Sequence, residues 1–115
     1  MTVTVYGIKN CDTMKKAFVW LGAHGVAFAF HDYRKDGIAR ADLERWSAAV
    51  GWEKVLNRAG TTFRKLPEAD RANLDCNGAI ALMLAQPAMI KRPIIEGAGI
   101  LELGFNADRY AAIFA

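Results

Sequence analysis

The pattern that decides the fold lies in residues 3–21, which read Val-Thr-Val-Tyr-Gly-Ile-Lys-Asn-Cys-Asp-Thr-Met-Lys-Lys-Ala-Phe-Val-Trp-Leu. The β-branched and aromatic side chains of residues 3–7 predict a short strand. From Asp12 onward, apolar side chains recur at the i, i+3, i+4 and i+7 spacing of one helix face: Met14, Ala17, Phe18 and Leu21. The loop between these two elements ends in Cys11, which therefore lies at the start of the helix.

The start of a helix is a position that makes a cysteine more reactive. The unpaired N–H groups and the positive end of the helix dipole favour the thiolate, and the thiolate is the nucleophile. Lys9, Lys15 and Lys16 add positive charge around Cys11, and Asp12 opposes part of it. We interpret Cys11 as a reactive nucleophile; the alternative is that it only fills a small, polarisable slot in the packing.

The composition is typical of one globular domain. The chain has 115 residues, of which 53% are hydrophobic and 23% are charged, which is enough for a core without disulfides. Two distant cysteines, no secretory leader pattern and no apolar run long enough to span a membrane favour a reduced, cytoplasmic protein. The net charge of +3 is too small and too dispersed to indicate nucleic-acid binding, although it suits a small anionic ligand.

The rest of the chain predicts a run of helices followed by a β-β-α unit. A strand over residues 26–33, entered through a left-handed cap at Gly25, completes a parallel β-α-β unit with the first strand and helix. Further elements follow in this order: a polar turn at 34–37, helices at 40–50 and 52–56, a loop at 57–62, helices at 67–74 and 77–85, strands at 93–96 and 100–103, and a helix from near Asn106. We expect an α/β protein, a single domain over residues 1–115, with a mixed four-stranded sheet flanked by helices and a helical insertion at about 37–88.

Three segments of the sequence resemble those of a known family. They are Tyr6-Gly7-Ile8-Lys9-Asn10-Cys11-Asp12-Thr13, Leu56-Asn57-Arg58-Ala59-Gly60-Thr61-Thr62 and Ile90-Lys91-Arg92-Pro93-Ile94. Occurring in this order over nearly the whole chain, they are similar to the arsenate-reductase-like (ArsC/Spx) family of the thioredoxin-like fold, and most similar to its YffB branch. Members of that branch have been proposed to be glutathione-dependent thiol reductases.

The resemblance implies a docking edge for glutathione opposite Cys11. The peptide bond before Pro93 would be cis and would face the cysteine loop. Pro93 would then expose the backbone of Arg92 as an open edge, on which an extended peptide-like thiol could pair. The alternative is that Pro93 is an ordinary proline at the entry to an edge strand.

Glutathione has carboxylates that basic residues of the matching segments would hold: Lys9, Arg58 or Arg92. Asn10 and Thr13 are interpreted as capping the helix or stabilising the sulfur and not as reacting, since such side chains bond free N–H groups at helix starts.

Two departures from the family pattern narrow the function. Position 14 is methionine where a dithiol thioredoxin has its second cysteine, so Cys11 would need a resolving thiol from another molecule, such as glutathione. The missing pair also counts against an Spx-like redox sensor that binds RNA polymerase, which is the alternative from a different class of protein. Arsenate reductases hold the oxyanion with three arginines. Arg92 matches one, Arg58 falls near another, and none occurs near Leu103-Gly104, which weakens an arsenate site.

The remaining candidates favour structural roles. Cys76 is interpreted as a half-buried structural cysteine, or alternatively as a resolving thiol. His24 and His31 are interpreted as cap or surface residues, and Trp46 and Trp52 as core. No Walker loop, dinucleotide-binding glycine motif or zinc-type Cys/His spacing occurs, so we expect no metal and no bound cofactor.

The sequence thus predicts a small cytoplasmic thiol reductase. The Cys11 thiolate would attack a disulfide or other oxidised substrate, and glutathione, as co-substrate, would resolve the resulting mixed disulfide. The expected partners are glutathione and a small-molecule or protein substrate, with neither nucleic acid nor membrane. RNA polymerase is a partner only under the regulator alternative.

Overall fold

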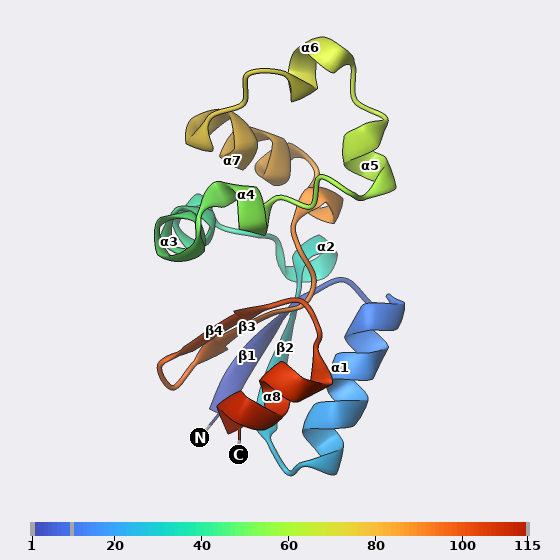
Figure 1. The fold of residues 1–115 in the computed structure, drawn as a ribbon, viewed down its shortest axis with the longest axis vertical. Helices are drawn as coiled ribbons and strands as arrows, with labels where there is room; N and C mark the ends of the chain where they lie inside the picture. Colours follow the sequence, from blue (N-terminus) through green and yellow to red (C-terminus); the bar gives the residue numbers. More distant parts are fainter. Residues whose placement is uncertain (1, 10, 115) are drawn as a thin grey trace. The chain divides into compact units, whose positions relative to one another are not determined.

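The computed structural model describes residues 2–9 and 11–114 (Figure 1). The chain divides into two compact units, one formed by residues 1–36 with 92–115 and one by residues 37–91. The first contains the sheet and is called the sheet unit; the second is made of helices and one isolated bridge and is called the helical unit. The predicted insertion at about 37–88 corresponds to the helical unit, while the prediction of a single domain stays a prediction.

The sheet unit combines two motifs from opposite ends of the sequence. The first comprises β1 (Thr2–Gly7), α1 (Asp12–Ala23), β2 (Ala27–Asp32) and the short α2 (Tyr33–Asp36). The second comprises β3 (Ile94–Gly97), β4 (Ile100–Leu103) and α8 (Ala107–Phe114). The strand order is β2-β1-β3-β4, with β1 parallel to β2 and β3 antiparallel to both of its neighbours. The predicted mixed four-stranded sheet is confirmed.

α1 and α8 pack together on one face of this sheet (Figure 1). Val3 and Val5 of β1 point to that face, because alternate side chains of a strand share a side. They form one buried core with residues from both helices and from β3: Met14, Ala17, Leu21, Ile95 and Tyr110. The apolar stripe read from the sequence is therefore the surface that holds α1 on the sheet.

α1 ends at Ala23, and the left-handed glycine that the sequence predicts follows it at position 25. Gly25 has a φ of +69°, a left-handed conformation that costs glycine nothing. Its N–H donates to the carbonyl of Gly22, and the chain then enters β2 directly.

The helical unit contains α3 (Arg40–Val50), α4 (Trp52–Val55), α5 (Thr61–Arg64), α6 (Glu68–Arg71), α7 (Cys76–Ala85) and the short 3-10 turn η1 (Pro87–Met89). Its buried apolar side chains are Leu43, Trp46, Val55, Leu56, Phe63, Ala79, Ile80, Met83, Met89 and Ile90. An antiparallel bridge between Leu56 and Ile90 links α4 to the end of the unit.

Two short helices lie where the sequence predicts a turn and the end of a loop. The predicted turn at 34–37 is wrong, whereas the predicted loop at 57–62 is confirmed over residues 57–60. The strand ends at Asp32 and residues 33–36 form α2, because the Asp32 carboxylate accepts the N–H of Arg34 at 2.9 Å. α5 interrupts the predicted loop at 57–62. Its single buried residue, Phe63, leaves no apolar period for a sequence pattern to reveal.

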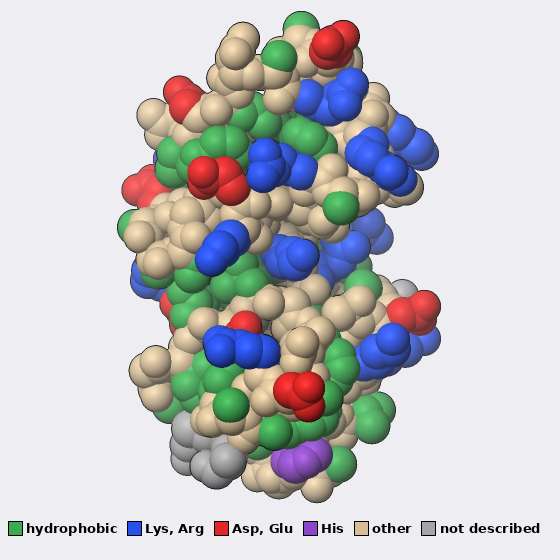
Figure 2. Space-filling view, in the orientation of Figure 1, with side chains coloured by type: hydrophobic (Ala, Val, Ile, Leu, Met, Phe, Trp, Pro, Cys, Tyr) green, Lys and Arg blue, Asp and Glu red, His purple; other side chains and the backbone are tan. Residues whose placement is uncertain are grey.

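No helix among the described residues is long and apolar enough to cross a membrane. Figure 2 shows acidic and basic side chains interspersed on one face, with the basic ones more prominent. This distribution agrees with the net charge of +3.

Candidate active site

Cys11 occupies the N-cap position of α1. Its backbone is extended, with φ −100° and ψ 132°, and its carbonyl accepts the N–H of Lys15 at 3.0 Å. The side chain is half-buried and packs against the core of the sheet unit. It makes no capping hydrogen bond of conventional geometry. The helix N–H groups therefore act on the sulfur mainly through their electric field, and that effect strengthens when the sulfur is charged.

The pKa of Cys11 lies below its ordinary value. Burial is the largest single influence and raises the pKa, but the Met14 N–H, a hydrogen bond from the Arg92 side chain and the Thr13 N–H each favour the charged sulfur and lower the pKa. The positive charge of Arg92 lowers the pKa further, and the net effect is downward. These surroundings are those that an activated cysteine needs; its reactivity stays a prediction.

Arg92 reaches Cys11 from the entry to β3. The Arg92–Pro93 peptide bond is cis, as the family resemblance implies. Pro93 is buried, and its carbonyl accepts the N–H of Gly104 at 2.8 Å, which joins the start of β3 to the end of β4. The alternative of a proline entering an edge strand is wrong, because β3 lies between β1 and β4.

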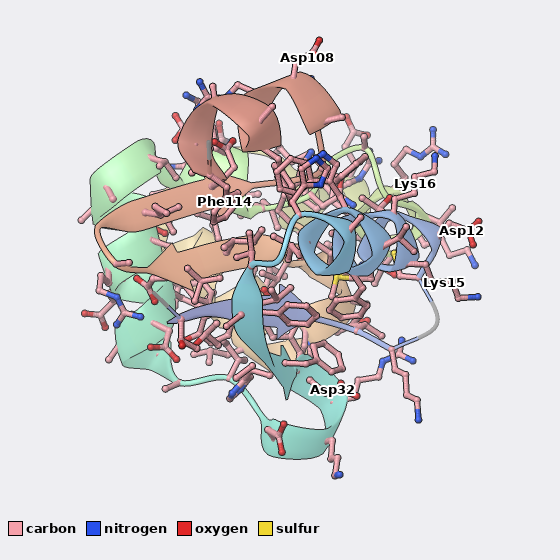
Figure 3. All side chains as sticks on the ribbon, turned by 90° about the horizontal axis from the view of Figure 1, so that it is seen from below. Asp12, Lys15, Lys16, Asp32, Asp108 and Phe114 are labelled. Carbon is pink, nitrogen blue, oxygen red and sulfur yellow. The ribbon has the colours of Figure 1, made fainter. Side chains whose placement is uncertain are left out.

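The other predicted site residues of the sheet unit come from the loop after β1 and the first turn of α1. Lys9 is exposed in that loop. Thr13 is half-buried, and its backbone N–H acts on the Cys11 sulfur. Asn10 lies outside the described residues, so its predicted role is untested. Figure 3 shows the charged side chains at this end of α1 pointing outward: Asp12, Lys15 and Lys16.

Met14 is the site residue that the sequence reasoning missed. Its side chain is 1% exposed, within the core, while its N–H acts on the Cys11 sulfur. Gly7 makes room for this side chain, because a Cβ at position 7 would collide with the Met14 sulfur and terminal methyl. The signal was present in the spacing, since an N-cap side chain faces the N–H groups two and three residues further on.

Arg58 and Cys76 belong to the helical unit. Arg58 is exposed, and its guanidinium carbon lies 5.9 Å from the centre of the Trp52 ring, a cation–π contact. Its predicted part in glutathione binding stays a prediction. Cys76 is the first residue of α7 and is exposed, so the predicted half-burial is wrong. Its helix becomes buried only from Ala79 onward.

Both histidines and Trp46 pack as predicted, whereas Trp52 does not. His24 follows α1, donates from Nδ1 to the Trp20 carbonyl at 2.8 Å and stacks on the Trp20 ring. His31, at the end of β2, lies 5.0 Å from the Tyr6 ring. Trp46 is fully buried, but Trp52 is only half-buried under Arg58. Within the described part of the chain, no three side chains of His, Cys, Asp or Glu gather as a metal site would require.

A mixed sheet in the order β2-β1-β3-β4, with a cysteine at the start of α1 and a cis-proline before β3, defines a thioredoxin-like protein. The ArsC family model matches residues 6–113, and the chain belongs to the ArsC family.

Two solved structures are similar over almost the whole chain. A protein named YFFB is 60% identical with a TM-score of 0.94, and the match covers 98% of this chain and 99% of that one. An arsenate reductase (ArsC) related protein from Brucella melitensis is 57% identical with a TM-score of 0.80, covering 99% and 95% of the two chains.

Two curated relatives are also similar over nearly the whole chain. An uncharacterized protein of Haemophilus influenzae is 43% identical over 98% of this chain and 99% of its own length. A global transcriptional regulator Spx of Streptococcus pyogenes is 29% identical over 98% of this chain and 85% of its own length.

Proposed function

We propose that the protein is a glutathione-dependent thiol reductase with Cys11 as its nucleophile. The observation that carries the proposal is the position of the Cys11 sulfur at the N-terminus of α1, with the Met14 and Thr13 N–H groups and the Arg92 side chain acting on it. These donors stabilise negative charge on sulfur, which is the form that attacks disulfides.

The proposed reaction reduces a mixed disulfide of glutathione in two exchanges. First, the Cys11 thiolate attacks the glutathione sulfur, a Cys11–glutathione disulfide forms, and the substrate thiolate leaves and takes a proton from solvent. Second, a glutathione thiolate attacks the same sulfur, so that glutathione disulfide leaves and the Cys11 thiolate is restored. The incoming glutathione is thereby oxidised and joins the glutathione taken from the substrate in one disulfide, while the substrate is reduced to its thiol. The donors that stabilise the thiolate also make Cys11 a good leaving group in the second exchange.

The proposal uses a second glutathione because the position of the usual resolving cysteine in the sheet unit carries no thiol. Position 14, where a dithiol protein has its resolving cysteine, is a methionine buried in the core. Cys76, the other cysteine, is exposed in the helical unit. We assign it no step in this cycle.

Binding of glutathione in this proposal uses charge and backbone. Arg92 has five N–H donors, so it can act on the Cys11 sulfur and still hold a carboxylate. Lys9, and Arg58 of the helical unit, are further candidates for the carboxylates. The segment of Arg92 and Pro93 is the proposed docking edge, and Thr13 and Asn10 support the sulfur. A reducing, cytoplasmic setting completes the proposal.

The experiment is a glutathione-coupled turnover assay with a glutathione mixed disulfide as substrate. We expect turnover in the wild type and in Cys76→Ser, no turnover in Cys11→Ser, and a mass increase of one glutathione on Cys11 when the second glutathione is withheld. A thiol at position 11 that neither forms this adduct nor supports turnover would contradict the proposal. Equal turnover in Cys11→Ser and the wild type would do so as well.

Arsenate reduction is the competing reaction, and the final hairpin argues against it. No arginine lies in residues 94–106, and Arg109 of α8 is engaged with Glu102 at 2.7 Å. A site with fewer cationic donors holds a multiply charged oxyanion less well. Robust glutathione-coupled arsenate turnover would reverse this ranking.

A regulator that binds RNA polymerase is the second candidate, favoured by the 29% identity to the Spx protein of Streptococcus pyogenes. Its test is copurification with RNA polymerase, compared between the wild type and Cys11→Ala. Retention of polymerase by both proteins, with no turnover in the assay above, would favour the regulator over the reductase.

A further inference from the structure

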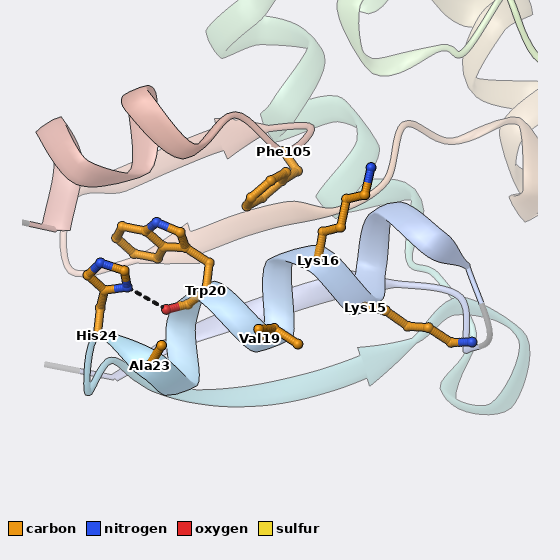
Figure 4. A pocket seen from close by; sticks show the side chains of 7 residues that line it. All are labelled: Lys15, Lys16, Val19, Trp20, Ala23, His24 and Phe105. Atoms are coloured by element: carbon orange, nitrogen blue, oxygen red, sulfur yellow. Dashed lines mark hydrogen bonds between the residues drawn. The ribbon is translucent and has the colours of Figure 1, made fainter.

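A groove runs along the outer side of α1, away from the sheet. Its floor comes from α1, including Lys15, Val19 and Trp20, and Phe105, in the loop between β4 and α8, forms a wall (Figure 4). Its volume is about 460 Å³. This lies within the range of about 300–1,000 Å³ that is common for small-molecule sites.

The groove is apolar where it is open to solvent. Val19 is 71% exposed, an unusual exposure for a large aliphatic side chain. Val19 lies one helical turn from Lys15, and Trp20 one turn from Lys16 and from His24, so two adjoining stripes of α1 line the groove. Burial of these apolar surfaces by a ligand would be favourable, because apolar area is removed from water.

The aromatic side chains that line the groove, Trp20 and Phe105, are held in place before any ligand binds. Trp20 and Phe105 both make edge contacts with Tyr110, at ring-centre distances of 5.4 Å and 5.0 Å. Tyr110 is itself fixed, because its hydroxyl donates to the Gly104 carbonyl at 2.8 Å. His24 stacks on the other part of Trp20, at 3.8 Å. Rigid walls reduce the entropy lost on binding, which favours a small ligand of matching shape.

Positive charge lies at one end of the groove. Lys15 and Lys16 line it near the N-terminus of α1 (Figures 3 and 4). Among residues 2–9 and 11–114, neither ammonium group lies within ion-pair distance of a carboxylate. The nearest acidic residue along the helix, Asp12, does not line the groove. An anionic group at this end would be attracted, while a ring or alkyl chain lay along Val19, Trp20 and Phe105.

We propose that this groove binds a small amphipathic organic anion, with its carboxylate or sulfonate at Lys15 and Lys16 and its aromatic or aliphatic body between Trp20, Val19 and Phe105. This site does not depend on the reactivity of Cys11. Its test therefore measures binding rather than turnover.

The probe is naphthoate, and naphthyl methanol serves as its neutral counterpart. Each is titrated into the full-length protein while amide and indole signals are followed by NMR. We expect saturable naphthoate binding, with shifts at the Trp20 indole and at the Val19 and Phe105 amides. Binding of the neutral alcohol should be weaker by about twofold to fivefold, the range of an exposed charge interaction.

Three variants separate the groove from general charge effects. Lys16→Glu should weaken naphthoate about threefold to tenfold, and Val19→Glu should abolish the shifts. Lys35→Glu changes the net charge equally but lies in α2, outside the groove, and should bind as the wild type does. Val19 and both lysines are exposed, so these variants should fold.

Equal affinities for acid and alcohol, or equal losses in Lys16→Glu and Lys35→Glu, would overturn the proposal. So would shifts confined to other parts of the chain. Self-association of the wild type that Val19→Glu removes, measured by sedimentation, would assign the groove to a second copy of the chain and would overturn it too.

Discussion

The side chain of Arg92, at the entry to β3, hydrogen-bonds to the sulfur of Cys11, at the start of α1. The two residues are brought together by the sheet. β1 and β3 are antiparallel neighbours with Tyr6 opposite Ile94. The segment that leaves β1 and the segment that enters β3 therefore meet at the same end of the sheet, and the strand order explains why a residue from the last quarter of the chain acts on Cys11.

Removal of Arg92 should raise the pKa of Cys11, because both a hydrogen bond and a positive charge are lost. We expect alkylation of Cys11 by iodoacetamide at neutral pH to slow several-fold in Arg92→Ala. Arg92→Lys keeps the charge without the planar fork of donors, so its alkylation rate should lie between those of the wild type and Arg92→Ala. The rates are measured against pH in a Cys76→Ser background, so that only one thiol reacts.

Lys9→Ala is the matched control for Arg92→Ala. Lys9 is exposed, and solvent screens exposed charges, so its loss should change the alkylation profile less than the loss of Arg92. Profiles with a common midpoint near the ordinary thiol pKa of about 8.5 in all of these proteins would contradict the activated thiolate.

The lowered pKa of Cys11 also predicts how stability depends on pH. A group whose pKa is depressed by folding stabilises the folded state above its unfolded pKa, and this contribution is lost as the pH falls through the folded pKa. The stability of the wild type relative to Cys11→Ser should therefore increase with pH between the two values and then level off. Urea unfolding from about pH 5 to about pH 9 covers this window. A difference that does not vary with pH, or that falls as pH rises, would be inconsistent with the lowered pKa.

Tyr110 should make the protein sensitive to alkali. Burial raises its pKa well above the ordinary value, and the negative charge of Glu102 raises it further. A raised pKa contributes stability below the unfolded value of about 10, and this contribution disappears as pH rises from there toward the folded value. Unfolding free energy should therefore fall more steeply above about pH 10 in the wild type than in Tyr110→Phe.

Tyr110→Phe has a second effect at neutral pH. It keeps the ring packing but removes the hydrogen bond to the Gly104 carbonyl, so we expect a loss of about 1 kcal/mol in urea unfolding. Phe114→Leu, a nearby change of a half-buried ring in α8, is the comparison variant. Phe114→Leu should leave the decrease of the unfolding free energy above about pH 10 as steep as in the wild type, because it removes no titrating group.

Gly7→Ala should destabilise the sheet unit by about 1–3 kcal/mol, because the new methyl group overlaps the end of the Met14 side chain. Met14→Val removes the overlapping atoms. In that background Gly7→Ala should cost less, with a coupling of about 0.5–3 kcal/mol in a double-mutant cycle of unfolding free energies. Additive costs would show that the two positions do not compete for space.

The sequence by itself determined the strands of the sheet unit and its first helix. The strand over residues 3–7, the helix stripe from Met14 to Leu21 and the glycine at position 25 carry periods and cap signals that depend only on local geometry. The hairpin at the end of the chain is equally local, because its two apolar strands flank a short glycine-rich turn.

Elements without such a period were missed. α2 depends on the hydrogen bond that the Asp32 carboxylate accepts from the Arg34 N–H, and α5 is anchored by the single buried residue Phe63. Cys76 shares a helical stripe with Ile80 but lies at the first, exposed turn of α7. Helical periodicity indicates which face of α7 is apolar. It does not indicate which turn of the helix packs against other residues, and that decides whether Cys76 is exposed.

At the candidate site, the sequence placed Cys11 at a helix start and singled out Arg92, while the tertiary structure decided what acts on the sulfur. The N–H of Met14 and the Arg92 side chain, together with Thr13, are the donors that outweigh the cost of burial. The groove beside Trp20 likewise arises only when α1 and Phe105 come together. The periods of helices and strands are set by local backbone geometry, so the sequence shows them. The charge on a sulfur and the walls of a groove depend on residues that are distant in the sequence and come together only in the folded sheet.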